Sequence, residues 1–143
     1  MEIIFAKKRE RIVAFLADFI IYLLIFLLFL FLWGKPNTEG TGHSVTGFPA
    51  FFLFVIGILL WPISESIFGQ TIGKRLVGVR VIDSKTFKHL TFSQAFIRFI
   101  FGYFDIILFL GLIVASTNKQ NKRIGDYVAK TAVIDLDKSR IRI

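Results

Sequence analysis

Four charged side chains lie inside segments that are otherwise apolar, and they are the best candidates for chemistry. They are Asp18, Glu65, Arg98 and Asp105. An ionisable group inside a membrane is costly, so it usually faces a helix bundle or a water-filled cavity. A buried carboxylate also tends to have a raised pKa, which allows proton exchange near neutral pH. The pattern favours a site that binds a cation or relays protons, but static ion pairs that fix helix packing explain it equally well.

The spacing of these charges suggests shared helix faces. Arg11 and Asp18 are seven residues apart with Ala14 between them, so a helix would place all three on one face. Asp18 would then lie about 9 Å into the first apolar segment, in the inner half of the membrane. Arg98 and Asp105 are also seven apart, and they share a face only if their segment is one continuous helix.

The sequence contains no recognisable enzyme motif or metal site. The absence of cysteine excludes thiol catalysis and zinc–thiolate centres, and His43 and His89 are too few and too far apart for a histidine-based metal site. Gly69 and Gly73 precede Lys74 with three residues between the glycines, whereas the phosphate-binding loop requires four. These glycines suit a turn better. We expect no catalytic residue, no metal and no cofactor.

The composition indicates a membrane protein. The 143 residues are 55% hydrophobic and include 18 phenylalanines, more apolar surface than a soluble domain of this size can bury. Three apolar segments stand out, at residues 12–33, 48–68 and 95–115. The first two are long enough to cross a bilayer, for which about 20 residues suffice. Pro62 is expected to kink the second segment just before Glu65.

Basic residues, which give a formal net charge of +8, lie mainly at the ends of the apolar segments. Residues 1–11 contain four Lys/Arg and residues 34–47 contain one, which predicts a cytoplasmic N-terminus. This orientation rule and attraction to anionic lipids explain the basic charge more simply than nucleic-acid binding does. We expect the lipid bilayer as partner and no nucleic acid.

Two short stretches, at residues 76–83 and 130–136, alternate in the manner of β-strands. If they pair with each other, both lie on the cytoplasmic side, and the third apolar segment must be re-entrant. If they do not pair, that segment is a third crossing. We therefore expect an all-α membrane protein with two transmembrane helices, a third membrane segment that spans or re-enters, and a small cytoplasmic two-stranded β element. The domain would cover residues 1–136, with a charged tail at 137–143.

Four blocks of sequence follow one another along the chain. They are RxxAxxxD at 11–18, ExxxGQTxGKRLxGxRV at 65–81, QAxxR at 94–98 and RIGDxxAxTxV at 123–133. Together they resemble the motifs of the RDD family of small membrane proteins, over about residues 8–135. The motif residues outside the apolar charges are Gly69, Gln70, Gly73, Lys74, Arg75, Arg123 and Gly125. One departure is Lys130, where the family usually has glycine.

The resemblance implies a multi-pass protein of a bacterial-type inner (plasma) membrane. The family is named for one arginine and two aspartates, which correspond here to Arg11, Asp18 and Asp126. Asp126 lies outside every apolar segment, so only the resemblance draws attention to it. We expect Asp126 to fold back to the cytoplasmic mouth and to pair with Arg11 or with Lys74 and Arg75.

Two functions are compatible with these patterns. The first is a cation or proton transport component, which the resemblance also implies for some family members, with the buried carboxylates binding or relaying the ion. So few spans rarely enclose a pathway, so a transporter would form a homo-oligomer, with Ala14 and Gly57 available for close packing. The alternative is a non-transporting scaffold or accessory subunit that binds another membrane protein or anionic lipid through the basic stretches 69–92 and 116–143.

Overall fold

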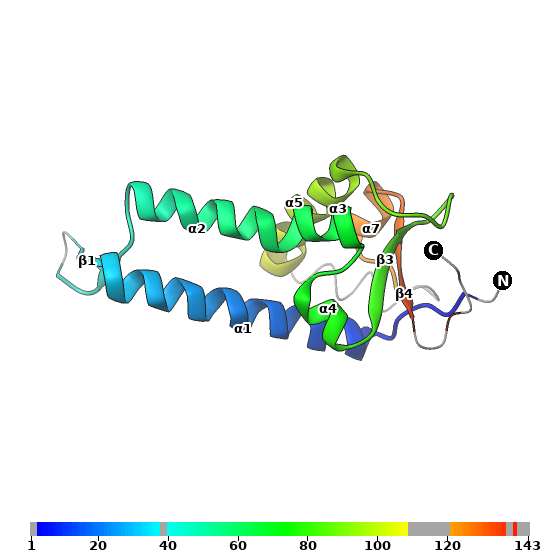
Figure 1. Cartoon of the computed structure of the whole chain (residues 1–143), viewed down its shortest axis with the longest axis horizontal. Helices are drawn as coiled ribbons and strands as arrows, with labels where there is room; N and C mark the ends of the chain where they lie inside the picture. Colours follow the sequence, from blue (N-terminus) through cyan, green and yellow to red (C-terminus); the bar gives the residue numbers. More distant parts are fainter. Residues whose placement is uncertain (1–2, 38–39, 109–120, 137–138, 140–143) are drawn as a thin grey trace.

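Two long antiparallel helical segments form an arm (Figure 1). The described residues from 69 onward form a small unit of helices and strands at one end of it. The computed structural model describes residues 3–37, 40–108, 121–136 and 139, with only the backbone of 103–108. The arm consists of α1 (Lys8–Trp33) and of three consecutive pieces, α2 (Phe48–Ile58), η1 (Leu59–Ile63) and α3 (Ser64–Phe68). At its far end, β1 (Lys35–Pro36) and β2 (His43–Ser44) form a short antiparallel pair that the sequence analysis did not predict.

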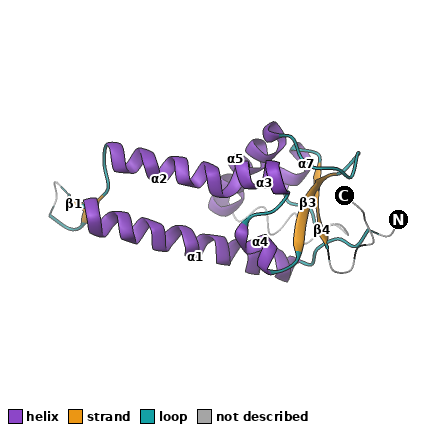
Figure 2. Ribbon diagram, viewed as in Figure 1, coloured by secondary structure: helices purple, strands orange, loops and turns teal. Residues whose placement is uncertain are grey.

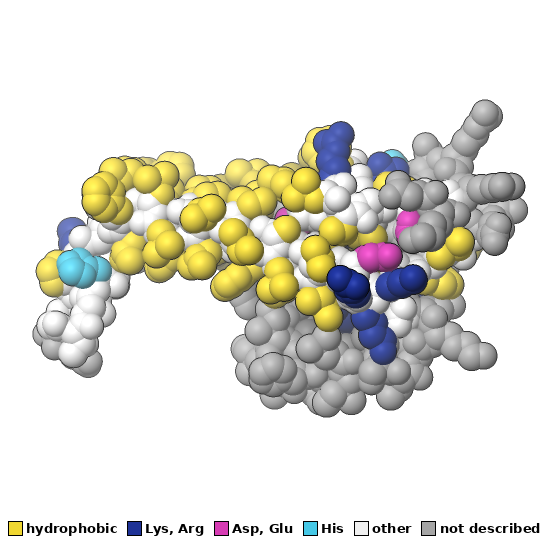
Figure 3. Space-filling view, turned by 90° about the horizontal axis from the view of Figure 1, so that it is seen from below, with side chains coloured by type: hydrophobic (Ala, Val, Ile, Leu, Met, Phe, Trp, Pro, Cys, Tyr) yellow, Lys and Arg dark blue, Asp and Glu magenta, His cyan; other side chains and the backbone are white. Residues whose placement is uncertain are grey.

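Both parts of the arm are long and apolar enough to cross a membrane. The candidate spans are Lys8–Trp33 and Phe48–Phe68, with mean hydropathies of 2.8 and 2.0. Only 11% and 22% of the residues in their apolar windows are buried, whereas a core helix of a soluble protein is mostly buried. Hydrophobic side chains cover most of the arm in Figure 3, which agrees with a lipid-facing surface. The two predicted spans are therefore present as candidate transmembrane helices.

The expected irregularity at Pro62 takes the form of a π-helix. Proline has no backbone N–H and disturbs the regular helical hydrogen bonds, so η1 interrupts the second span where Pro62 lies. The Ser66 hydroxyl donates to the Ile63 carbonyl at 2.9 Å, and the Ser64 hydroxyl donates to the Gln70 carbonyl at 2.7 Å. This irregular region leads directly into α3, which carries Glu65.

The predicted pairing of two strands is confirmed. Strand β3 (Val79–Asp83) lies antiparallel to β4 (Thr131–Asp135), with Val81 opposite Val133 (Figure 2). The N-terminal segment adds a further contact, because Phe5 bridges to Ile134 on β4. The sheet lies at the end of the arm where α1 begins and α3 ends (Figure 1).

The first strand begins later than predicted, and the prediction of strand at residues 76–78 is wrong. A short helix, α4 (Ile72–Leu76), occupies the beginning of that stretch. The Thr71 hydroxyl accepts the Lys74 N–H at 3.3 Å and so caps the helix. Gly78 then turns the chain into β3 with a φ of +68°, a conformation that favours glycine. The alternating pattern alone did not reveal this cap and turn.

Buried side chains line both faces of the sheet. One cluster contains Ala6, Ala14, Val79, Val81, Leu90, Ala95 and Val133, and it joins the sheet to α1 and to α5 (Phe92–Leu108). The other cluster contains Ile82, Ala132 and Ile134, with Ile3, Phe5 and Leu136 packed against it. All residues of β4 are buried, including the polar Thr131 and Asp135 at its two ends.

The third apolar segment is only partly described. Helix α5 covers Phe92–Leu108, and the rest of the expected segment 95–115 lies outside the described residues. Most of the expected tail 137–143 does so too. The chain then forms α7 (Ile124–Val128) and returns to the sheet through β4. Whether the domain ends at residue 136 stays a prediction.

Candidate functional site

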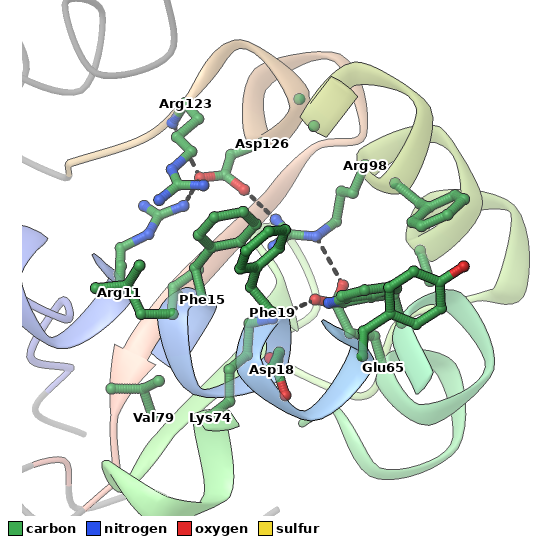
Figure 4. Close-up of a pocket in the computed structure, with 18 residues that line it drawn as sticks. Arg11, Phe15, Asp18, Phe19, Glu65, Lys74, Val79, Arg98, Arg123 and Asp126 are labelled. Atoms are coloured by element: carbon green, nitrogen blue, oxygen red, sulfur yellow. Dashed lines mark hydrogen bonds and ion pairs between the residues drawn. The ribbon is translucent and has the colours of Figure 1, made fainter. Parts of the chain in front are cut away.

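A chain of alternating charges connects five helices where the arm meets the small unit (Figure 4). Lys74 Nζ lies 2.6 Å from Glu65 Oε1, and Arg98 Nε lies 3.0 Å from Glu65 Oε2. Arg98 Nη1 also pairs with Asp126 Oδ1, and Arg11 Nη2 pairs with Asp126 Oδ2. We call these five residues the charge network. It joins α1, α3, α4, α5 and α7.

Each member of the network is positioned by its own local structure. Asp126 lies in the first turn of α7, where its Oδ2 also accepts the Arg123 N–H at 3.0 Å. Arg98 projects from α5 and donates to the Thr131 hydroxyl on β4 at 2.8 Å, in addition to its two carboxylates. Arg98 is therefore the central member, because it contacts both carboxylates and the sheet.

Asp126 is almost fully buried, with an exposed fraction of 2%. Burial alone would raise its pKa, but the neighbouring Arg98 and Arg11 outweigh this effect and hold the pKa of Asp126 well below its usual range. The carboxylate therefore stays ionised at neutral pH. A group in this state suits a permanent ion pair better than a proton relay.

Asp18 is not part of the charge network. It binds the beginning of α4 instead. Its Oδ1 accepts the Gly73 N–H at 2.7 Å, and its Oδ2 accepts the Thr71 hydroxyl. A negative charge is favourable at this end of a helix. The contact needs glycine at position 73, because a Cβ there would lie 2.1 Å from the Ala14 carbonyl oxygen. Ala14, Asp18 and Gly73 together let α1 and α4 approach closely.

The glycine-rich motif forms a structural turn. Gly69 has a φ of +67°, and a Cβ there would lie 2.9 Å from the Val81 carbonyl oxygen. The Val81 N–H donates to the Gly69 carbonyl at 2.7 Å, and the Gln70 side-chain amide donates to the Val79 carbonyl at 2.9 Å. Arg75 is exposed at the end of α4. These contacts hold the end of α3 against β3.

The closing motif also packs closely. A Cβ on Gly125 would lie 3.2 Å from Phe101 Cβ and 3.5 Å from the Arg98 carbonyl oxygen, so glycine lets α7 lie against α5. Lys130, where the resemblance pointed to glycine, has a φ of +55°. This conformation costs a side-chain-bearing residue about 1–2 kcal/mol. The closing turn thus keeps a glycine-like backbone despite its lysine.

The structure brings together most of the residues that the sequence analysis selected. Of the expected pairs for Asp126, the one with Arg11 is present, whereas Lys74 pairs with Glu65 instead. The side chain of Asp105 lies outside the described residues. Thr71 and Thr131 were not selected as site residues, and only their places in the family-like motifs singled them out.

A cavity of about 470 Å³ adjoins the network. Its lining includes Arg11, Asp18, Glu65, Arg98, Arg123 and Asp126, and it continues between aromatic side chains of α1, η1 and α5. Phe15 and Phe19 lie beside the network in Figure 4.

The sequence model of the RDD family matches residues 5–130, which include the whole charge network. The chain belongs to the RDD family. It is also 33% identical over 135 residues to an uncharacterized membrane protein, YteJ, of Bacillus subtilis (strain 168). That alignment covers 87% of this chain and 77% of YteJ. No solved structure matches the chain.

Two of the residues that correspond to the name of the RDD family, Arg11 and Asp126, form a direct ion pair, and the third, Asp18, holds the start of α4. In this RDD protein the three residues therefore join α1 to the small unit beside it.

Proposed function

We propose that this RDD protein is a non-transporting, non-catalytic membrane scaffold. The observation that carries the proposal is that all three carboxylates described at the site are engaged by donors of the chain itself. Glu65 and Asp126 each contact two cationic side chains, and Asp18 accepts a hydroxyl and a backbone N–H. A transported cation would have to displace these partners and leave buried cations unpaired, which is strongly unfavourable.

The arrangement of the elements supports a platform at one membrane surface, by which we mean the small unit at the end of the arm. The hydrogen bonds between β3 and β4 require the intervening chain to begin and end at the same end of the arm. The third segment is accordingly re-entrant or peripheral in this proposal. The basic residues near the sheet, together with the four at the N-terminus, favour the cytoplasmic side of a bacterial-type inner membrane.

The platform presents apolar side chains beside the membrane span. Ile72 and Leu76 on α4, which lies outside the second candidate span, are exposed, and Leu76 is the more exposed of the two at 72%. Apolar patches of this kind favour contact with another protein. Ala14 and Gly57 are less suited to oligomer contacts, because Ala14 is covered by Gly73 and a Cβ on Gly57 would meet Tyr22 at 3.7 Å. A different membrane protein is therefore the proposed partner.

Two measurements separate scaffold from transporter. The protein in liposomes should produce no sodium- or potassium-dependent proton flux above that of empty liposomes. A clear flux that Glu65→Gln abolishes in folded protein would refute the scaffold.

The second measurement places a photoreactive amino acid at position 76 or, as a matched control, at Phe31. Both side chains are strongly exposed, but Phe31 lies on the part of α1 far from the platform. In native membranes we expect a discrete protein adduct from position 76 and only lipid adducts from position 31. Lipid adducts alone at both positions would argue against a partner on this surface.

A further inference from the structure

The cavity beside the charge network is not accounted for by a scaffold role. Protein interiors are closely packed, and large voids are few. A cavity of about 470 Å³ falls within the usual range of ligand pockets, about 300–1,000 Å³. The network itself needs no such space, because its ion pairs are formed directly between side chains. The cavity therefore has room for a ligand that is separate from the charge network.

The cavity changes from charged to aromatic along α1. Arg11 lies near the start of the helix, and Tyr22 lies eleven residues, or about 16 Å, further along it. At the aromatic end the Tyr22 and Trp61 rings are 5.2 Å apart, and the Trp61 and Phe99 rings are 6.0 Å apart. A membrane amphiphile has the same order, with its head group at the surface and its hydrocarbon further in.

One wall of the cavity reaches the outer surface of the span. Leu16 and Phe19 line the cavity and are also about half exposed on α1. The surroundings of this part of α1 are hydrocarbon if the helix spans the membrane as its hydropathy indicates. An acyl chain can therefore reach the aromatic end from the side, without passing the charge network.

The charged end favours an anion. Among the described residues, four cationic side chains and three carboxylates line the cavity, which leaves a formal excess of one positive charge in this part of the chain. Arg98 is central among them and is shielded from water, with a side-chain exposure of 10%. Its planar group can bind phosphate or carboxylate oxygens in addition to its present partners. The carboxylates, in contrast, already have donors and offer little to a cation.

We propose that this cavity binds an anionic membrane amphiphile. Its phosphate or carboxylate head group lies against Arg98 and Arg123, and its hydrocarbon chain lies along Tyr22, Trp61 and Phe99. An anionic phospholipid and a free fatty acid share this chemistry. The inference does not depend on the scaffold role, because a transporter with the same cavity would bind the same ligand.

The two tryptophans provide a direct test. Trp61 lines the cavity, and Trp33 lies at the far end of α1. Full-length Trp33→Phe and Trp61→Phe variants, each with one tryptophan, are reconstituted with lipids whose acyl chains carry bromine, which quenches nearby fluorescence. The probes are brominated phosphatidylglycerol, brominated phosphatidylcholine and dibromostearate.

We expect an anionic probe to quench Trp61 at about tenfold lower mole fraction than brominated phosphatidylcholine, the factor that one charge-assisted hydrogen bond provides. Trp33 should be quenched equally by all three probes, because it reports only surrounding lipid. Phosphatidylglycerol as the better quencher would assign the site to a phospholipid, and dibromostearate would assign it to a fatty acid. Equal quenching of Trp61 by all three would overturn the proposal.

Gly102 allows the cavity to be filled without disturbing the network. It lines the cavity, and a Cβ there would meet nothing within 4 Å. Gly102→Leu should abolish the selective quenching of Trp61, while Gly102→Ala, which occupies far less space, should retain it. Helical content and thermal stability of both variants show that they are folded. Selective quenching that persists unchanged in folded Gly102→Leu would place the lipid elsewhere and refute the inference.

Discussion

Neutralising Asp126 should destabilise the small unit at the end of the arm more than any other single change of charge. Asp126→Asn leaves the buried Arg11 and Arg98 without their shared carboxylate. Removal of one partner from a buried ion pair typically costs about 3–5 kcal/mol. Arg11→Gln should cost less, because Arg98 still neutralises Asp126. The double variant should cost about 1–3 kcal/mol less than the sum of the single changes, because the two side chains contact each other directly.

Amide hydrogen exchange of the purified protein is the appropriate assay. Exchange of the backbone amides that β3 and β4 bond to each other reports opening of the sheet, whereas exchange in α2 reports the span. A loss of 3 kcal/mol would accelerate exchange in the sheet about 10²-fold, with α2 unchanged.

Asp83→Asn is the matched control. It removes a carboxylate from the same unit, but its hydrogen-bond partners are Gln94 and a local turn rather than the network. This change should lower the free energy of unfolding by about 1 kcal/mol. Additivity of Arg11→Gln and Asp126→Asn within about 0.5 kcal/mol would refute the direct coupling. A charge swap between positions 11 and 126 should fail to rescue the single changes, since the new arginine at 126 would face Arg98.

Three further outcomes are expected. The pKa of Asp126 is lower in the folded protein than in the unfolded chain, so its stabilising contribution is complete above the unfolded pKa and is lost as pH falls through the folded pKa. In equilibrium unfolding, the difference in stability between wild type and Asp126→Asn should therefore stay constant from pH 7 to 5 and narrow only below about pH 4. Gly73→Ala should force α4 away from α1 and lower the melting temperature markedly, while Gly102→Ala should not. Lys130→Gly should raise the free energy of unfolding by about 1 kcal/mol, and an unchanged value would contradict a strained lysine.

The two spans and the strand pair could be predicted because their signals are local and strong. Apolar runs of membrane length identify the spans, and the similar runs VRVID at 79–83 and TAVID at 131–135 indicate two strands. The helix at Ile72–Leu76 could not be predicted, because its stability comes from the Thr71 cap and from Asp18, which is distant in sequence. The alternating apolar residues at 76–83 instead indicated a strand that begins at residue 76.

The membership of the charge network was predictable, but its connections were not. The cost of charge in a membrane drew attention to Glu65 and Arg98, whereas Asp126 was found only through the resemblance. That Arg98 joins both carboxylates depends on the packing of α5 against α3 and α7, which no spacing in the sequence encodes. The bridge from Phe5 to β4 was missed because the N-terminal stretch is too short to give a clear strand pattern.

The separation of 115 positions between Arg11 and Asp126 has a consequence for biosynthesis. At about 5–20 residues per second, a ribosome makes Asp126 roughly 6–23 s after Arg11. Glu65 and Lys74 are nine positions apart and can meet almost at once, as can Asp18 and Thr71 soon after both are made. A nascent or truncated chain therefore holds an arginine at the start of its first span without the carboxylate that neutralises it. Completion of this ion pair therefore comes only after both candidate spans have been made.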